Sequence, residues 1–354
     1  MSSCNYIPET NQFFSFMDQE TKKNTIPMSG TFELTPRCNF NCKMCYVHLL
    51  KDQIPNYGRE LTGDEWIQLG KQARDAGMLQ LCITGGEPLL HPEFIKIYKA
   101  LSQMGFFITL QTNASTISDE MVEVFKEYPP QEVKLTIYGS NDEIYKEVCG
   151  IDKGFTKVNE GIQKLKQLQI PILAVTTIIK QNLNDLIHIQ KYCHWNQIPW
   201  IYTATVQPSI RGANTDVRSV SIEEKDATDY RADVRYMIEN PLMKDDKKPC
   251  EYCKGHHNSF WITWNGNMRF CSFMNEPNIS VIDQTFESAW QQLIQYEEQL
   301  TWPKECQTCE IRHICRRCIG MLASRSGNVH QVDVEYCNKI KKYVKEEMEK
   351  QHEI

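Results

Sequence analysis

Three closely spaced cysteines are the residues of this chain with the clearest chemical potential. They follow the pattern C-x₃-C-x₂-C, as Cys38, Cys42 and Cys45, so one short loop gathers three thiolates and supplies no fourth. A structural zinc site takes four closed ligands, whereas an iron–sulfur cluster held by three cysteines keeps one iron open. Taken alone, the triplet also fits half of a zinc site or a chance grouping.

A second motif, Gly85-Gly86-Glu87-Pro88, follows the short apolar run 79–83. Two adjacent glycines let backbone groups approach a ligand closely, and Glu87 offers a carboxylate to a cation. Alone, the motif is typical of a turn that ends a strand. The cysteine triplet also follows an apolar segment, residues 31–35. Because both motifs then lie at strand ends, the ligand-binding interpretation is favoured.

Composition narrows the classes of function. A chain of 354 residues can bury a large core and form two domains. Its net charge of −6 and the absence of a basic block argue against a nucleic-acid partner. With neither 18 uninterrupted apolar residues nor a signal-peptide pattern, we expect a cytoplasmic protein without a membrane partner. Fifteen cysteines in a cytosolic chain then favour metal or redox chemistry over disulfides.

The order of expected elements predicts an α/β architecture. Short β-rich runs occur at 31–35, 79–84, 106–111, 132–138, 172–179 and 198–205. Helix-period segments lie between them, at 62–76, 92–103, 118–127, 155–168 and 185–195. Helix-start signals precede several of these segments, including Thr62 with Glu65, Ser118 and Asn184-Asp185. Such alternation predicts a parallel sheet with right-handed crossovers, whose ligands bind at the carboxyl ends of the strands.

The pattern changes after residue 205. We expect a helix over 221–239, and a hairpin at Asn265-Gly266, which is a strong turn signal between β-rich runs. The last residues, from Asn338, are typical of a charged, solvated helix. The expected division is an N-terminal segment 1–28, a barrel 29–220, a connection 221–249, a cysteine-rich domain 250–337 and a helix 338–354.

Eight of the fifteen cysteines lie after residue 249. They are Cys250, Cys253, Cys271, Cys306, Cys309, Cys315, Cys318 and Cys337. Eight thiolates are two full sets of four, enough for two closed [4Fe–4S] clusters. Two structural zinc sites fit the Cys-x₂-Cys pairs equally well, so the spacing alone does not decide between the two.

Together, the cysteine triplet and the Gly85-Gly86-Glu87 turn resemble the radical SAM superfamily. The resemblance implies a partial (β/α)₆ barrel in which Cys38, Cys42 and Cys45 hold a [4Fe–4S] cluster. The open iron of that cluster would chelate S-adenosylmethionine (SAM), and the Gly-Gly-Glu turn would contact the methionine amino group. Further cofactor-binding positions carried over from the family are Met44, beside the adenine, with Asn113 and Thr136.

The C-terminal cysteines resemble a SPASM domain, the extension of many peptide-modifying radical SAM enzymes. Its pattern C-x₉₋₁₅-G-x₄-C is matched by Cys253, Gly266 and Cys271, and C-x₂-C-x₅-C is matched from Cys306. Two residues separate Cys315 from Cys318, where the family usually has three. The resemblance implies two auxiliary [4Fe–4S] clusters, three clusters in all. One would be held by Cys250, Cys253, Cys271 and Cys318, the other by Cys306, Cys309, Cys315 and Cys337.

The resemblance implies an oxidoreductase that cleaves SAM to a 5′-deoxyadenosyl radical and removes hydrogen from a ribosomally made peptide. Crosslinking, thioether formation, epimerisation and oxidation share this machinery. A reductant such as flavodoxin or ferredoxin would supply electrons. With some 28 residues before the barrel, we expect the leader to be bound by a separate small protein, or directly by the barrel and the 206–222 connection. Cys149 is a candidate hydrogen donor near the barrel mouth.

Other functions stay open at this point. Sulfatase-maturing relatives carry an acid after the cysteine equivalent to Cys271, and here Ser272 takes that place, which argues against formylglycine formation. A small-molecule radical dehydrogenase usually keeps one auxiliary cluster, so eight C-terminal cysteines argue against it. An iron–sulfur electron carrier or a structural zinc protein needs no Gly-Gly-Glu turn and no open coordination position.

Overall fold

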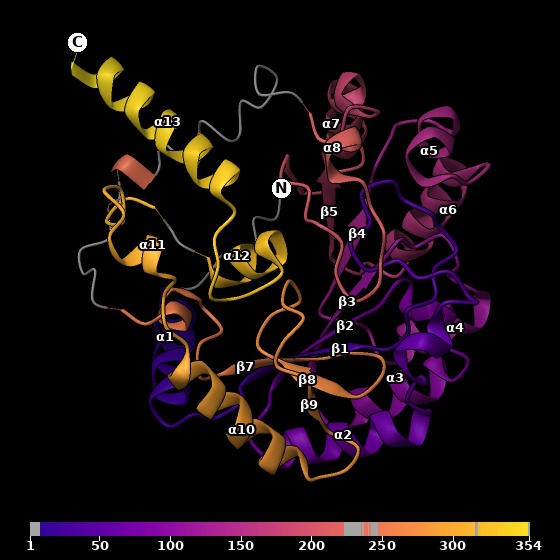
Figure 1. Cartoon of the computed structure of the whole chain (residues 1–354). Helices are drawn as coiled ribbons and strands as arrows, with labels where there is room; N and C mark the ends of the chain where they lie inside the picture. The colour runs from indigo at the N-terminus through magenta and orange to yellow at the C-terminus, as the bar shows by residue number, and fades with distance from the viewer. Residues whose placement is uncertain are drawn as a thin grey trace.

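The structure, a computed structural model, describes residues 8–222, 235, 237–239, 241, 247–315 and 318–352. Six parallel strands form the first part of its sheet (Figure 1). They are β1 (Ser29–Glu33), β2 (Gln80–Thr84), β3 (Phe107–Thr112), β4 (Glu132–Thr136), β5 (Ile172–Thr177) and β6 (Trp200–Thr203). Each strand pairs in parallel with the next along the chain. The predicted α/β fold with a parallel sheet is confirmed.

Helices connect these strands and cover the sheet. They are α2 (Gly63–Asp75), α3 (Phe94–Gln103), α4 (Asp119–Glu127), α5 (Asp142–Cys149), α6 (Gly154–Gln167) and α7 (Leu186–Trp195). Thr62 and Glu65 form the expected capping box, and Ser118 caps α4. Asp185 does not cap α7; its carboxylate accepts hydrogen bonds from Ser140 instead. Helix α5 was not predicted, although Asn141 caps it.

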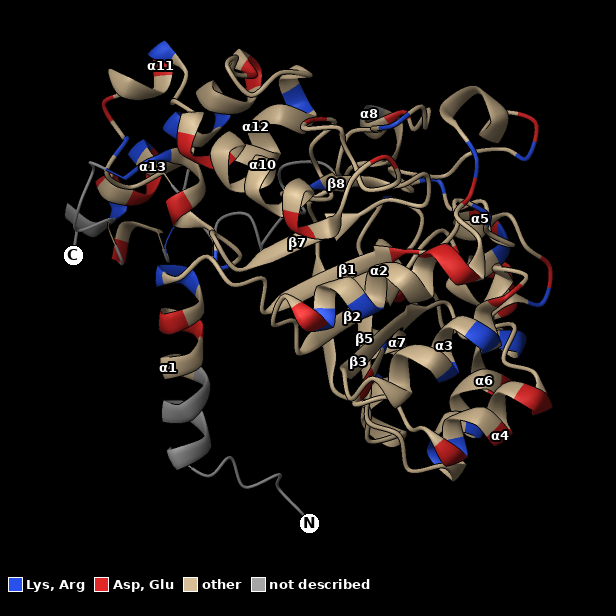
Figure 2. Cartoon of the chain, turned by 90° about the horizontal axis from the view of Figure 1, so that it is seen from below, with Lys and Arg blue, Asp and Glu red and all other residues tan. Residues whose placement is uncertain are grey.

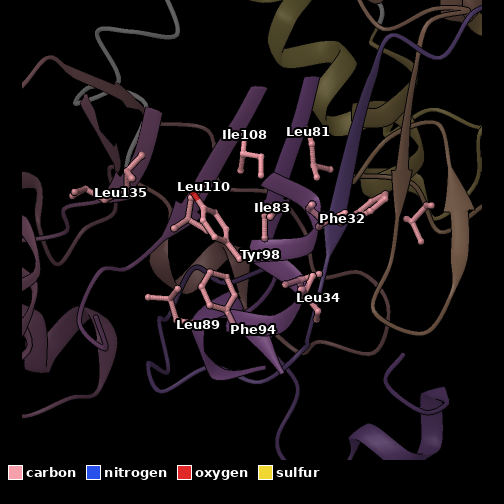
Figure 3. Packing of buried hydrophobic residues seen from close by; sticks show 14 of the residues in the cluster. Phe32, Leu34, Leu81, Ile83, Leu89, Phe94, Tyr98, Ile108, Leu110 and Leu135 are labelled. Atoms are coloured by element: carbon pink, nitrogen blue, oxygen red, sulfur yellow. The ribbon is translucent and has the colours of Figure 1, made fainter. Parts of the chain in front are cut away.

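Aliphatic and aromatic side chains fill the space between sheet and helices (Figure 3). Phe32 and Leu34 lie two residues apart on the helix-facing side of the sheet at β1, and Leu81 and Ile83 do so on β2. The spacing of two places both side chains of each pair on one face of the sheet. The Tyr98 ring on α3 packs among these residues in Figure 3, and all five are fully buried or nearly so.

The sheet continues beyond the six strands into the cysteine-rich region. Strand β7 (Ser259–Ile262) pairs in parallel with β1, and β8 (Asn267–Arg269) and β9 (Ile279–Ser280) follow antiparallel. The hairpin predicted at Asn265-Gly266 is therefore confirmed. Helix α10 (Phe286–Gln299) packs on this extension, and its Phe286 lies in the same core cluster as Phe32. The expected boundary near residue 250 thus separates two parts that share one sheet and one core.

The remaining elements flank the sheet. Helix α1 (Pro8–Lys23) precedes β1, α8 (Val217–Val220) follows β6, and α11 (Lys304–Gln307), α12 (Ile319–Ser326) and α13 (Val334–His352) complete the chain. In Figure 2, acidic and basic segments are interspersed along the outer helices. Among the described helices, none has the length and apolar character needed to cross a membrane. Most of the helix predicted over 221–239 lies outside the described residues.

The C-terminal helix differs from the expectation of a solvated helix. Helix α13 begins at Val334, four residues earlier than predicted, and includes Cys337. Ile340, Tyr343 and Val344 are buried and form a small second core with Ile314. This apolar stripe at helical spacing was not predicted, because the sequence interpretation considered only the pattern of Lys and Glu residues.

A buried ion pair links the segment after β6 to strands β1 and β7. The Arg211 guanidinium lies 2.8 Å from the carboxylate of Glu33 at the end of β1. The Trp261 indole on β7 donates to the same carboxylate at 3.0 Å, and Arg211 also donates to the Ser272 carbonyl. The side chains of Arg211 and Glu33 are 10% and 5% exposed, so the pair is largely shielded from water.

We expect Arg211→Met to destabilise the fold by roughly 3–5 kcal/mol, because it leaves the Glu33 carboxylate buried without its cation. Arg74→Met is the matched control, since Arg74 makes an exposed pair with Asp75 worth about 0–1 kcal/mol. Urea unfolding of both variants under identical conditions measures the difference. Equal midpoints for the two variants would show that the buried pair does not hold this segment.

Candidate functional site

The cysteine triplet lies in the loop after β1, and helix α5 fixes its backbone. The Asn41 amide donates to the Cys149 carbonyl at 2.8 Å, and the Lys43 amide donates to the Val148 carbonyl at 2.9 Å. The last carbonyls of a helix lack partners within the helix, so the loop amides satisfy the end of α5. The unpredicted helix is therefore part of the support for Cys42.

The Gly85-Gly86 turn holds the other side of this loop. The Gly86 amide donates to the Thr35 carbonyl at 2.8 Å, and the Glu87 amide donates to the Arg37 carbonyl at 2.7 Å. A Cβ on Gly86 would lie 2.5 Å from the Arg37 carbonyl oxygen, and one on Gly85 would lie 2.6 Å from that of Thr35. Both contacts are with backbone, which cannot move aside cheaply. Two glycines are required here so that the turn can lie against the cysteine loop.

Glu87 is fully buried at the centre of the three strand-end loops. Its carboxylate accepts from the Leu89 amide at 3.1 Å, the Thr112 hydroxyl at 2.7 Å and the Asn113 amide at 2.7 Å. Burial raises the pKa of the carboxyl to about 7, while the three hydrogen bonds act in the opposite direction. The side chain therefore joins the end of β2 to the end of β3.

Asn113 connects the third loop to the cysteines. Its side-chain amide donates to Asn39 Oδ1 at 2.9 Å and lies 4.0 Å from Cys38 Sγ.

Met44 is buried in the main core. Thr136 ends β4 and is half-buried, two residues before Tyr138, whose buried phenol lies near Cys42. The predicted SAM-binding residues thus occupy the carboxyl ends of neighbouring strands.

Cys149 lies against the cysteine triplet. It is the last residue of α5 and is fully buried, and its thiol forms a hydrogen bond with Cys42. This bond, together with burial, holds the pKa of the Cys42 thiol well above its usual range. The role of Cys149 as a hydrogen donor to a substrate stays a prediction, because its neighbour in the structure is a proposed cluster ligand.

The raised pKa values of the three thiols are those expected of a site where a metal takes the place of the thiol protons. Burial raises the pKa of the Cys45 thiol to about 11 and also raises that of Cys38. Such thiols stay neutral at pH 7 unless a metal takes the proton's place, because a coordinating thiol is deprotonated outright. Three partly buried thiols on one loop therefore fit the iron atoms of a cluster.

A cavity of about 430 Å³ opens beside Cys42 and Cys45. Polar groups line most of it: Asn41, Lys43, His48, Gln181, Asn214, Thr215, Asp216 and Ser219. Gln181 Oε1 is buried with no hydrogen-bond partner among the described residues. A polar small molecule fits such a cavity better than an apolar one. Sequence interpretation missed Gln181, which no motif marks.

The C-terminal cysteines gather in two groups. A second cavity, of about 260 Å³, is lined by Cys306, Cys309, Cys315, Cys318 and Cys337. In the other group, burial raises the pKa of Cys271 to about 11, and the nearby thiols of Cys318 and Cys253 add to that effect. Cys250 lies near Cys253 and Cys271 in the same way. Cys318 thus stands between the groups, close to Cys253 and Cys271 as well as on the second cavity.

We expect Glu87→Leu to destabilise the cluster-free chain by about 1–3 kcal/mol, because buried donors lose their acceptor. The Leu89 amide and the Thr112 hydroxyl now donate to Oε1, and the Asn113 backbone amide donates to Oε2. Urea unfolding checks this, with the exposed Glu123→Leu in α4 as control, expected within about 0.5 kcal/mol of wild type. Indistinguishable curves for Glu87→Leu and wild type would refute the proposed joining of β2 and β3.

Comparison with known proteins identifies the barrel. Residues 32–193 match the family model of the radical SAM superfamily. The sporulation killing factor maturation protein SkfB of Bacillus subtilis is 26% identical over 198 residues, which cover 56% of this chain and 47% of that protein. An AdoMet-dependent heme synthase of Methanosarcina barkeri is 22% identical over 340 residues, covering 88% and 96% of the two chains.

The fold resembles that of a solved structure over most of its length. Streptococcus suis SuiB bound to precursor peptide SuiA superposes with a TM-score of 0.62 at 17% identity. The match covers 91% of this chain and 79% of that one. At this level of identity the likeness concerns the fold, and it extends beyond the barrel into the cysteine-rich region.

Proposed function

Because residues 32–193 form a radical SAM domain, we propose that this enzyme uses SAM to modify a ribosomally made peptide. One observation carries the proposal: the loops after β1, β2 and β3 meet around Cys38, Glu87 and Asn113, while eight further cysteines gather in two groups. A maturation protein, SkfB, among the relatives supports a peptide as the substrate, and so does the likeness to SuiB, a protein solved with its precursor peptide.

In this proposal Cys38, Cys42 and Cys45 hold the SAM-binding [4Fe–4S] cluster. When bound, the cluster supplies the electron that splits SAM into methionine and a 5′-deoxyadenosyl radical, which takes a hydrogen atom from a substrate carbon. The residues of the chain position SAM and exclude water. Gly85, Gly86 and Glu87 keep the cysteine loop in place, and Gln181 offers an acceptor to a polar ligand in the cavity beside Cys42.

The C-terminal cysteines would hold two auxiliary clusters. Removing a hydrogen atom leaves an electron on the substrate, and a crosslink or oxidation needs an acceptor for it. Clusters ligated by four cysteines are suited to that transfer. We also propose flavodoxin or ferredoxin as the reductant and a separate protein that binds the leader. The division into domains and a cytoplasmic location, both expected from the sequence, are part of the same proposal.

A tetrapyrrole is the second candidate substrate. The heme synthase relative aligns along 88% of this chain and 96% of its own length, so the alignment extends beyond the barrel. The two candidates differ in what stimulates formation of 5′-deoxyadenosine by the reduced enzyme. A candidate precursor peptide that gains a mass change supports the proposal. Stimulation by an iron tetrapyrrole, with every peptide unchanged, would replace it with the second candidate.

We expect Cys42→Ala to abolish reductive cleavage of SAM and to lower the iron content by about four atoms per chain, leaving the auxiliary clusters in place. Cys82→Ala is the matched control, because Cys82 is a half-buried thiol on β2 outside the three groups. Liquid chromatography of 5′-deoxyadenosine and iron analysis provide the two readouts. Cleavage that survives in Cys42→Ala would disprove this assignment of the first site.

The assignment of Cys318 is tested by paired substitutions. If Cys318 shares a cluster with Cys250, then Cys250→Ala/Cys318→Ala should lose only about four iron atoms per chain, as Cys250→Ala does alone. Cys306→Ala/Cys318→Ala should lose about eight, because two clusters are then broken. The reverse pattern would place Cys318 with Cys306 and overturn the grouping carried over from the family.

A further inference from the structure

Two adjacent histidines and a buried glutamate lie together outside the cysteine sites. His256 and His257 belong to the turn before β7, and Glu297 lies in the last turn of α10. One potential ligand atom from each of the three lies within 4.8 Å of the other two. We propose that His256, His257 and Glu297 bind one divalent transition-metal ion, and that zinc fits this ligand set best.

The backbone of the turn brings the two rings to one side. The His256 amide donates to the Cys253 carbonyl at 3.2 Å, and His257 has a φ of +61°. A positive φ is uncommon for a residue with a side chain, and such strain concentrates at functional sites. The centroids of the two imidazole rings lie 3.6 Å apart, with the ring planes tilted by 31°. The close approach brings a nitrogen of each ring within reach of one ion.

Glu297 is the second, independent observation. Its side chain has 0% exposure, and Oε1 has no hydrogen-bond partner in the described part of the chain. Oε2 accepts from the His257 amide at 3.3 Å and lies 2.8 Å from His256 Nδ1. A buried carboxylate with one unpaired oxygen is costly unless a cation lies beside it. The contact with His256 Nδ1 engages Oε2 and leaves Oε1 unsatisfied, whereas a metal ion can engage either carboxylate oxygen.

The donor set indicates the kind of ion. Zinc binds histidine nitrogen and carboxylate oxygen, usually with four ligands. Water can take the fourth position, as it does where three protein ligands hold zinc. Calcium and magnesium prefer oxygen ligands only, so two imidazoles argue against them.

The position of the site gives it a structural role. Cys250 and Cys253 lie in and just after the short 3₁₀ helix η5 (Pro249–Tyr252), and the site begins three residues beyond Cys253. A metal ion there would tie this segment to α10, since the histidines come from one and Glu297 from the other. It would hold in place two cysteines proposed to bind an auxiliary cluster, without being part of that cluster.

The test uses the anaerobically reconstituted holoenzyme, incubated with zinc and then dialysed against a weak chelator. We expect wild type to retain one more zinc ion per chain than His256→Gln and Glu297→Gln, at equal iron and sulfide content. His194→Gln, an exposed histidine at the end of α7, is the control and should retain zinc as wild type does. Zinc should also raise the melting temperature of wild type and of the control, but not of the two site variants.

His257→Gln, at a side chain that is 17% exposed, keeps the test decisive if burial makes Glu297→Gln lose iron. Lower zinc in His257→Gln at full iron content supports the site. Equal zinc in wild type, His256→Gln and His257→Gln would overturn the proposal, as would wild type that retains no zinc. Because iron content is followed throughout, failure of the zinc site is distinguishable from failure of the cluster assignments.

Discussion

The direct backbone contact between the Gly85-Gly86 turn and residues 35–37 is the constraint on which the site depends. Side chains at the two glycines would push the turn away from the cysteine loop, since each Cβ would meet a carbonyl oxygen at 2.5–2.6 Å. With the turn in place, Glu87 reaches the end of β3 and Asn113 reaches Cys38. The motif is thus as much a scaffold for the cluster loop as a surface for a ligand.

The continuous sheet joins the two chemical regions of the chain. Strand β7 extends the barrel sheet next to β1, and the cysteine triplet follows β1 directly. The Glu33–Arg211 pair, with Trp261, then ties the ends of β1 and β7 to the segment that borders the cavity beside Cys42. In the proposed function, electron transfer between clusters would require fixed separations, which a shared sheet provides better than a hinge between two independent domains.

The sequence predicted the elements that have strong periodicity and local signals. All six barrel strands and the hairpin at Asn265-Gly266 are present, because apolar runs and turn residues encode them locally. Helix α5 was missed because it is only eight residues long, in spite of its Asn141 cap. The burial of Tyr343 was missed because a charge pattern outweighed an apolar stripe.

The same distinction between local patterns and distant contacts applies to the candidate site. Motifs and family resemblance identified the cysteines and the Gly-Gly-Glu turn. They did not identify Gln181, the Cys149–Cys42 contact or the His256–Glu297 pair, which depend on residues distant in sequence. No local pattern encodes such contacts, because they depend on how the loops at the strand ends pack. The grouping of Cys318 is of the same kind, because spacing alone would group it with Cys306, Cys309 and Cys315, whereas the family pattern groups it with Cys250, Cys253 and Cys271.

The central claim is that this chain combines a SAM-binding cluster with two auxiliary clusters. Iron and acid-labile sulfide in the anaerobically purified protein test that claim most directly. About twelve of each per chain is the predicted result for three [4Fe–4S] clusters. About four iron atoms with two zinc ions would contradict it, because the eight C-terminal cysteines would then be structural zinc ligands with no capacity to accept an electron.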